Sequence, residues 1–181
     1  MTPTQILMHE HEVILMVLEG AEREARAIAA GGPVDEAKVS QIVDFIRNFA
    51  DRCHHGKEEN VLFARLVERG FPKDFGPIGI MLQEHALGRE HVQAIARALP
   101  QAVSGDGAAR TKLVDSMLGY VALLRSHIHK ENNVLFPMAE QALSDEDRSM
   151  LIEAFEKVER EELGEGTHER YHLLAHELAG R

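Results

Sequence analysis

The amino-acid sequence predicts an all-α protein: an antiparallel up-down four-helix bundle made from a duplicated helical hairpin, with further helices at the C-terminus. Three observations predict this class. The dominant residue types are ones that lose little side-chain freedom in a helix. Apolar residues recur three to four positions apart in long segments joined by short Gly- and Pro-containing loops, and no run alternates as a strand does. A motif of ten residues also occurs twice.

Capping and breaking residues predict where the helices begin and end. Thr2 before Pro3 is typical of a helix start, and Ser144 and Thr167 open two further helices as caps. Pro100 is expected to end the third helix. The predicted helices cover residues 4–29, 35–69, 77–99, 108–142, 144–163 and 167–178, with a Gly-Glu-Gly turn at 164–166. We expect residues 1–143 to form the bundle and residues 144–181 to form a C-terminal helical extension packed on it.

Charge and cysteine content exclude several classes of protein. A net charge of −10 argues against a nucleic-acid binder, which normally presents a basic face. Cys53 is the one cysteine, so a disulfide framework is excluded and a reducing cytoplasm is the expected location. No signal peptide is recognisable, and no apolar run approaches the roughly 20 residues that span a membrane. We therefore expect a cytoplasmic protein without nucleic-acid or membrane partners.

The chain contains 11 histidines, and several of them belong to an internal repeat. The segment His54–Phe63 matches His127–Phe136, and the Glu-His pair at 10–11 recurs at 84–85. Each half therefore contributes one Glu-His pair and one His-x-x-x-Glu motif. A duplicated hairpin of this kind predicts a bundle with pseudo-twofold symmetry and a shared central site.

The repeated histidines and glutamates lie on apolar faces of the predicted helices. Positions i and i+4 share one helix face, so His54 and Glu58 point the same way. In the fourth helix the apolar stripe runs through Leu113, Met117, Tyr120, Leu124, His127, Glu131, Val134 and Met138. Similar stripes in the other helices complete a set of six polar side chains that are predicted to face the core: His11, His54, Glu58, His85, His127 and Glu131.

Two inward-facing glutamates require compensation. Burying one unpaired carboxylate costs several kcal/mol, and a domain has a total stability of only ~5–15 kcal/mol. No Lys or Arg lies on the same stripes, and Arg89, one turn after His85, comes nearest. A pair of divalent cations would provide the compensation, since imidazole and carboxylate together suit iron, manganese or zinc.

These motifs resemble those of the hemerythrin-like, HHE cation-binding family over roughly residues 5–140. The matching motifs are Glu-His at 10–11 and 84–85 and His-x-x-x-Glu-x-Asn-Val-Leu-Phe at 54–63 and 127–136, and the second half is especially similar to bacterial proteins that repair iron centres. The resemblance implies two non-haem iron ions, with zinc or manganese as alternatives. In the family pattern one iron is bound by His11 and His54 and the other by His85 and His127, while Glu58 and Glu131 bridge the pair together with an oxo or hydroxo group.

Two departures from the family bear on the expected function. Oxygen-carrying hemerythrins have a second histidine on the third helix, but the positions four residues from His85 hold Met81 and Arg89. This argues against reversible oxygen carriage. The repair proteins carry an N-terminal segment with a cysteine, which is not expected in this chain, and that argues against the repair role.

The remaining histidines are predicted to lie off the site. His9, His55 and His129 are one or two positions from the proposed ligands, and so they point to other sides of their helices. His55 and the Glu four residues later form a competing pair, but the repeat argues against it because their counterparts are Ile128 and Asn132.

The C-terminal segment carries histidines at positions 168, 172 and 176. Residues 168–172 spell His-Glu-x-x-His, which is the zinc-protease signature. We set that interpretation aside because the motif needs a third ligand and a sheet-framed cleft. Two alternatives stay open: a solvated amphipathic helix, or a tail helix that folds over the bundle and supplies a fifth imidazole from His168 or, second, from His172.

The sequence thus predicts a protein with a metal pair and open coordination positions. The expected function is to bind or sense dioxygen, nitric oxide or peroxide, or to sense iron or redox state, and the expected partner is a small diatomic ligand or peroxide. The alternatives are iron storage or delivery, including the repair of iron centres, and a structural module that is metal-free or filled with zinc.

Overall fold

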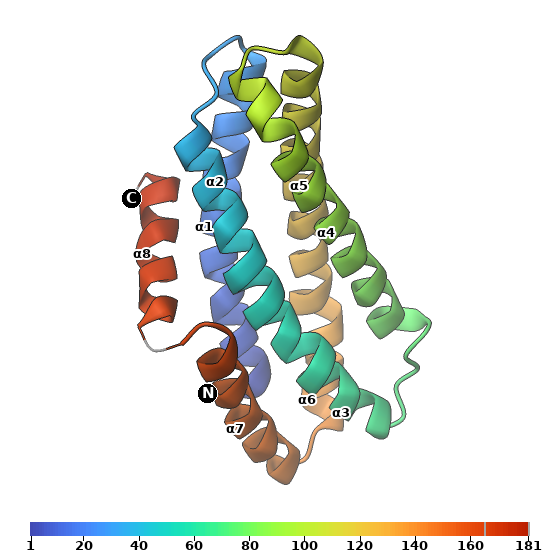
Figure 1. The fold of residues 1–181 in the computed structure, drawn as a ribbon. Helices are drawn as coiled ribbons and strands as arrows, with labels where there is room; N and C mark the ends of the chain where they lie inside the picture. Colours follow the sequence, from blue (N-terminus) through green and yellow to red (C-terminus); the bar gives the residue numbers. More distant parts are fainter. Residues whose placement is uncertain (165, 181) are drawn as a thin grey trace.

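The computed structural model describes residues 1–164 and 166–180, and every regular element in that part of the chain is a helix. Figure 1 shows long helical rods packed side by side, with shorter helices outside them. The predicted all-α class, a helical bundle with C-terminal helices, is confirmed. Among these residues, no helix has both the length and the apolar character that a bilayer crossing requires.

The four rods are continuous helical stretches, and two of them contain wider π-helical turns. The first rod is α1 (Pro3–Ala29). The second rod joins α2 (Glu36–Phe45), η1 (Ile46–His55), η2 (Glu58–Leu62) and α3 (Phe63–Glu68). The third is α4 (Gly76–Val103), and the fourth joins α5 (Gly107–Lys130), η3 (Glu131–Leu135) and α6 (Phe136–Ala142). The outer helices are α7 (Asp145–Glu162) and α8 (Thr167–Ala179).

Side-chain caps explain two of the helix starts. The Thr2 hydroxyl accepts a hydrogen bond from the Gln5 backbone N–H, and the Gln5 side chain accepts one from the Thr2 N–H. Pro3 occupies the first turn, as predicted. Ser144 forms the same reciprocal arrangement with Asp147 at the start of α7, again as predicted.

The predicted end of the third helix is wrong by about one turn. α4 continues through Pro100 to Val103. The fixed φ of proline is itself helical, so the ring removes only the hydrogen bond to the carbonyl of Ala96 near the end of the helix. The last turn still closes, with the Ser104 N–H donating to the Pro100 carbonyl over 3.2 Å.

The π-helical turns change the register of the apolar face. Each N–H in such a turn bonds five residues back rather than four, so the residues that follow are rotated relative to an α-helix. Val134 and Met138, which were predicted to face the core, are 49% and 39% exposed, whereas the neighbouring Leu135 and Ala139 are buried. The predicted stripe of the fourth helix is therefore wrong after Glu131.

The bundle core consists of two apolar clusters with a polar layer between them. Along α1, Leu7 belongs to one cluster and Ile14 to the other, with His11 between them. Along α4, Met81 and Val92 belong to the two clusters in the same way. The polar layer thus lies inside the bundle, with apolar side chains packed above and below it.

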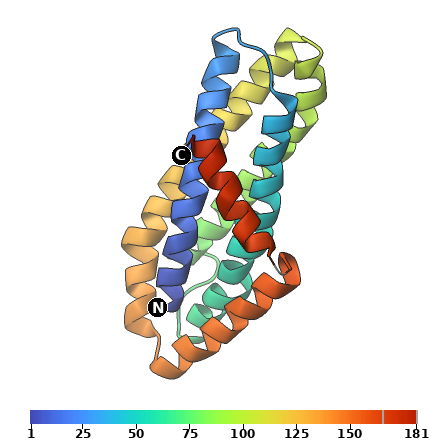
Figure 2. The ribbon, with the colours of Figure 1, turned by 90° about the vertical axis from the view of Figure 1, so that its left-hand side faces the viewer.

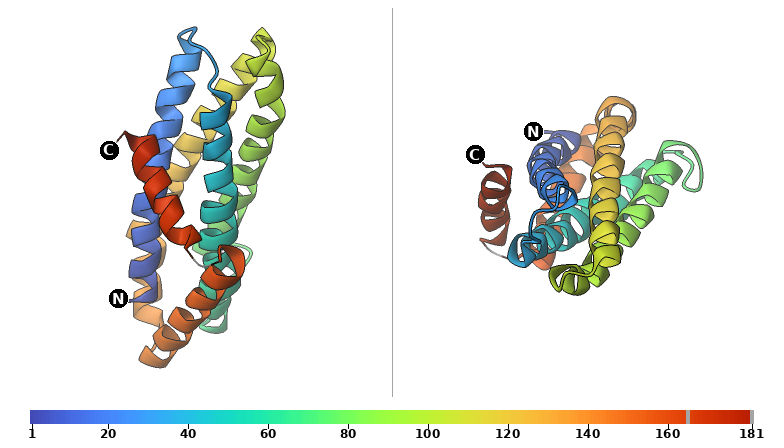
Figure 3. Two further views of the ribbon diagram at one scale, coloured as in Figure 1. Left: turned by 60° about the vertical axis from the view of Figure 1, so that its left-hand side comes forward. Right: turned by 90° about the horizontal axis from the view of Figure 1, so that it is seen from above.

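The outer helices cover one side of the bundle. α8 lies along the outside of α1, and α7 crosses the end of the bundle at which the chain begins (Figures 2 and 3). A Cβ on Gly20 of α1 would lie 2.5 Å from the carbonyl oxygen of Leu178, so glycine permits this close approach. Tyr171 of α8 donates a hydrogen bond of 2.9 Å to Asp44 of the second rod.

The start of α8 differs in detail from the prediction. Gly166 stands at the cap position before Thr167 and has a φ of 74°, a left-handed conformation that favours glycine. No side-chain hydrogen bond caps the helix there. The turn predicted at 164–166 includes Glu165, which lies outside the described residues.

Candidate metal centre

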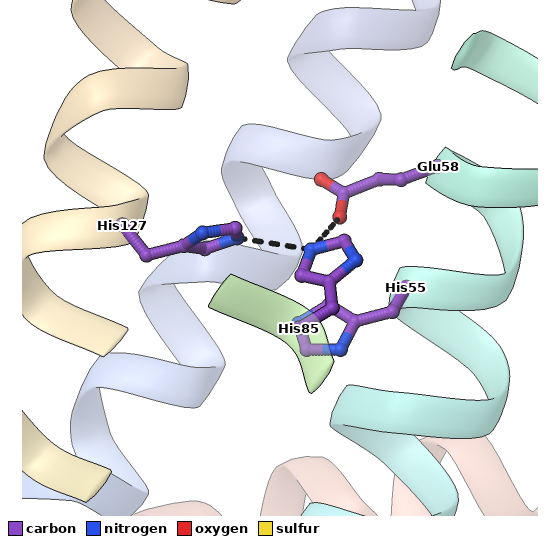
Figure 4. Close-up of side chains that lie close together, drawn as sticks. All are labelled: His55, Glu58, His85 and His127. Atoms are coloured by element: carbon purple, nitrogen blue, oxygen red, sulfur yellow. Dashed lines mark hydrogen bonds and ion pairs between the residues drawn. The ribbon is translucent and has the colours of Figure 1, made fainter. Parts of the chain in front are cut away.

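The six side chains predicted to face the core meet in the polar layer, and none of them is more than 1% exposed. Together with His55 they form two groups, in each of which the donor atoms lie within 4.8 Å of one another. One group is His11, His54, Glu58 and Glu131, and the other is His55, Glu58, His85 and His127. Figure 4 shows the second group, in which the His85 ring contacts both Glu58 and His127. Glu58 belongs to both groups.

Each central carboxylate reaches imidazoles from both halves of the repeat. Glu131 Oε2 lies 3.2 Å from the Nε2 atoms of both His11 and His127. The two oxygens of Glu58 lie 3.3 Å from Nε2 of His54 and of His85. None of the four carboxylate oxygens has a hydrogen-bond partner of acceptable geometry. The donor set therefore fits cations placed between the carboxylates and the imidazoles.

Outer acceptors fix the orientation of the four imidazoles. Each ring has its Nδ1 within hydrogen-bond distance of an oxygen outside the central layer, which leaves Nε2 directed inward. The pairs are His54 with Glu10 at 2.8 Å, His127 with Glu84 at 3.0 Å, His85 with Glu59 at 2.7 Å and His11 with Asn132 at 2.7 Å. An imidazole that donates from Nδ1 presents its lone pair on Nε2, which is the form that binds a metal.

Three of these outer acceptors are in turn paired with cations. Lys57, 1% exposed, bonds Glu10 at 2.5 Å, and Lys130 bonds Glu84. Arg89 donates to Glu59 at 2.7 Å. The outer acceptors and the lysines were not predicted from the sequence. The repeat could have indicated them, because the acids recur at 10 and 84 and the lysines at 57 and 130.

In the absence of metal, the layer balances its charge with protons. Burial and the neighbouring Glu58 carboxylate raise the pKa of Glu131, but His127 outweighs them and lowers that pKa to about 2. Burial lowers the pKa of His54, but the Glu58 and Glu10 carboxylates raise it to about 10. The carboxylates therefore stay ionised and the imidazole takes up a proton, so the layer carries positive charge where cations would sit.

The prediction that His55 points away from the site is wrong. Its ring is 4% exposed and stacks on His85, with 3.8 Å between the ring centroids and 15° between the planes. The position is buried whatever the type of helix, because its counterpart Ile128 in the ordinary α-helix α5 is 3% exposed. His9 and His129 are exposed, as predicted.

The geometry does not favour the alternative in which the tail supplies a fifth imidazole. His168 is grouped with Glu10 and Glu159, and its ring lies 4.5 Å from that of His172. Neither tail histidine belongs to the two interior groups found among the described residues. α8 docks on the outside of α1 (Figure 3), and the rings of His168 and His172 contact Phe49 of the second rod.

A cleft of about 180 Å³ leads from the surface to the second group. It lies between η1 and α4, and its wall includes His55, His85, Arg89 and Tyr120. The cleft therefore brings the outside of the molecule to the two stacked imidazoles.

The fold and the site together define a helical-bundle protein with an interior metal-binding layer. The family model of the hemerythrin HHE cation-binding domain matches residues 2–139, and the chain belongs to this family. The predicted resemblance is thereby confirmed.

The curated relatives are longer than this chain. Uncharacterized proteins of Mycobacterium tuberculosis and Mycobacterium bovis are 26% identical over 164 residues, which cover 91% of this chain and 64% of theirs. The iron-sulfur cluster repair protein YtfE of Yersinia pseudotuberculosis is 33% identical over 89 residues, which cover 48% of this chain and 40% of that protein. The chain thus spans less than two thirds of the length of these relatives. No solved structure matches it.

Proposed function

We propose that the protein holds two non-haem iron ions in its polar layer and uses them to bind or sense dioxygen, nitric oxide or peroxide, or to sense iron or redox state. One observation carries the proposal: Glu58 and Glu131 are fully buried, and their four oxygens lack hydrogen-bond partners. Leaving such groups without cations costs several kcal/mol each. Membership in a family named for cation binding supports the same conclusion.

The proposed division of the donors follows the geometry of the layer. His11 and His54 hold one ion and His85 and His127 hold the other, since these pairs fall into separate groups. Glu58 and Glu131 bridge the pair, together with an oxo or hydroxo group, because each carboxylate reaches imidazoles on both sides. The outer acceptors keep the rings in place, and the apolar clusters above and below exclude water.

The iron pair, when bound, supplies redox chemistry and open coordination positions for a small ligand. Four imidazoles and two shared carboxylates do not fill the positions of two octahedral ions. Zinc and manganese suit the same donors. We propose iron because the chain is similar over 89 residues to a protein named for iron-sulfur cluster repair. The buried thiol of Cys53 accords with a cytoplasmic setting.

The test is a metal analysis with parallel optical spectra. Protein loaded anaerobically with iron should retain about two irons per chain and show charge-transfer bands after oxidation, which change on reduction and on exposure to nitric oxide. Loading in the presence of equal zinc and manganese shows which metal the site retains. Iron well below one per chain after anaerobic loading would refute the proposal.

Iron delivery, including repair of iron centres, is the second candidate function. The similarity to the repair protein over part of its length favours it. A delivery protein should give up iron to an apo iron-sulfur protein faster than to a chelator of comparable affinity. Equal rates of transfer to the two acceptors would remove the basis of this candidate.

A further inference from the structure

The two halves of the repeat differ at one place beside the polar layer. Three neighbouring polar residues on one side of the layer stand where the equivalent positions on the other side hold three apolar residues. The polar residues are Asp51, His55 and Arg89. The apolar residues at the equivalent positions are, in the same order, Leu124, Ile128 and Leu15. The polar set forms a connected unit, because Arg89 bonds Asp51 at 2.8 Å and Asp51 lies 3.3 Å from His55.

The contacts of His55 leave one ring nitrogen without a partner. Its Nδ1 donates to the Asp51 carboxylate, which leaves the lone pair on Nε2. Nε2 is buried and has no hydrogen-bond partner. An unsatisfied buried acceptor destabilises the fold, and Ile128, which is also buried, shows that an apolar side chain fits the equivalent position.

The unpartnered Nε2 atom of His55 lies beside the other donor atoms of the second group. It belongs to the group whose other donors are Glu58, His85 and His127, all within 4.8 Å of one another. The ring stacks on His85, and both rings line the cleft of about 180 Å³. The bond to Asp51 orients His55 as the outer acceptors orient the other four imidazoles.

We propose that His55 is a fifth imidazole ligand and binds the ion held by His85 and His127. This inference rests on the proposed metal pair. It makes the two ions unequal, with three imidazoles on one and two on the other, although the repeat alone would make them alike. The fifth imidazole thus comes from the second rod of the bundle.

Proton NMR of the protein loaded with cobalt(II) tests the assignment directly. Each ligating imidazole that keeps a proton on Nδ1 gives one strongly shifted, solvent-exchangeable resonance. We expect five such resonances in the unaltered protein and four in His55→Ile, which copies the residue of the other half. His129→Ala removes an exposed histidine and should keep all five.

Further measurements separate the possible failures. Four resonances in both the unaltered protein and His55→Ile would overturn the proposal while leaving the metal pair intact. Failure of the unaltered protein to bind two cobalt ions would instead count against the proposed function. Circular dichroism of the metal-free variants checks their folding. Should His55→Ile not fold, Asp51→Asn keeps the ring and is expected to shift one resonance and leave the other four in place.

Metal release provides a kinetic test that does not depend on spectroscopy. A chelator should remove one of the two ions from His55→Ile at least about tenfold faster than from the unaltered protein, and the other ion at nearly the same rate. Unchanged release of both ions would show that His55 is not a ligand.

Discussion

The two halves of the bundle build the same inner layer but surround it differently. In the half made of α1 and the second rod, Lys57 is buried and contacts both Glu10 and Glu159 of α7. In the other half, Lys130 makes the equivalent contact with Glu84, yet its side chain is 35% exposed. The extra cover comes from α7, which follows the repeat and lies on one side only.

This difference separates what the duplication determines from what was added to it. The duplication accounts for the four imidazoles, the two carboxylates and the acid-lysine pairs behind two of the imidazoles. The C-terminal extension and the residues at 51, 55 and 89 then make the two sides of the polar layer differ in polarity and in their access to solvent. Variants made in pairs, one in each half, can therefore measure how far the symmetry extends.

The largest effect is expected from removal of the central carboxylates, where the halves should behave alike. Glu58→Ala and Glu131→Ala should each weaken metal binding by more than about 100-fold, because each carboxylate reaches imidazoles of both halves. This loss is larger than the roughly 10- to 100-fold that is typical when a group behind a metal ligand is removed. Metal analysis after dialysis measures the loss, with exposed Glu156→Ala as the control. Full metal content in both variants would show that neither carboxylate is a bridge.

The lysines should show the difference between the halves in stability. Lys57→Met leaves the buried Glu10 carboxylate with the His54 imidazole as its remaining partner, and we expect a loss of about 3–5 kcal/mol. Lys130→Met removes a partly exposed pair and should cost about 0–1 kcal/mol. Urea unfolding of the metal-free proteins measures both. Glu10→Gln combined with Lys57→Met should recover much of the loss, and equal effects of the two lysine variants would contradict the comparison.

The pH dependence of the metal-free protein should show the two halves losing stability at different pH. Burial lowers the pKa of His85, but Glu58 and Glu59 raise it to about 9, while that of His54 is raised to about 10. A raised pKa gives stability that is complete below the ordinary value near 6.5 and is lost as the pH rises through the folded-state pKa. Denaturation at a series of pH values should show this decline.

Single variants assign the two parts of that decline. His85→Gln should remove the part near pH 9, and His54→Gln the part near pH 10. On the acid side, the low pKa of Glu131 predicts stability that is lost as the pH falls from about 4.5 toward 2. A flat profile between pH 6.5 and 10 would mean that the interior imidazoles are not protonated in the metal-free protein.

The smallest effect is expected in the tail. His168→Ala and His172→Ala should leave the metal content unchanged, because both rings lie outside the two interior groups. Metal analysis beside His11→Ala, which should lose metal, gives the scale. Loss of an ion in His168→Ala would restore the tail as the source of a ligand.

The sequence predicted the inner layer well because helical spacing and the repeat both act on it. His54 and Glu58, four residues apart, had to share a face, and the second copy confirmed which face. The apolar residues on each side of them indicated burial. For these residues, the spacing along one helix is sufficient to predict which way the side chains face.

The predictions from the sequence were wrong for His55 and for the last part of the fourth helix. His55 was placed off the site because it is one position from His54 and its counterpart in the repeat is Ile128, yet both positions are buried. The predicted stripe of the fourth helix is wrong from η3 onward because ideal α-helical angles were assumed. Contacts such as those of Lys57 join segments far apart in the chain, so spacing within one helix could not reveal them.

The wide turns η2 and η3 begin at the two central glutamates, Glu58 and Glu131. A wide turn accommodates about one residue more than an α-helical turn. Beyond the polar layer, the buried face of the second and fourth rods therefore falls about one position later in the sequence than an α-helix would place it. Deleting the extra residue of a turn would therefore leave an ordinary helix in which Leu62 or Leu135 still faces the apolar cluster that it helps to form. Inserting a further residue there would instead rotate that leucine away from the cluster, so these two turns are expected to tolerate a deletion of one residue better than an insertion.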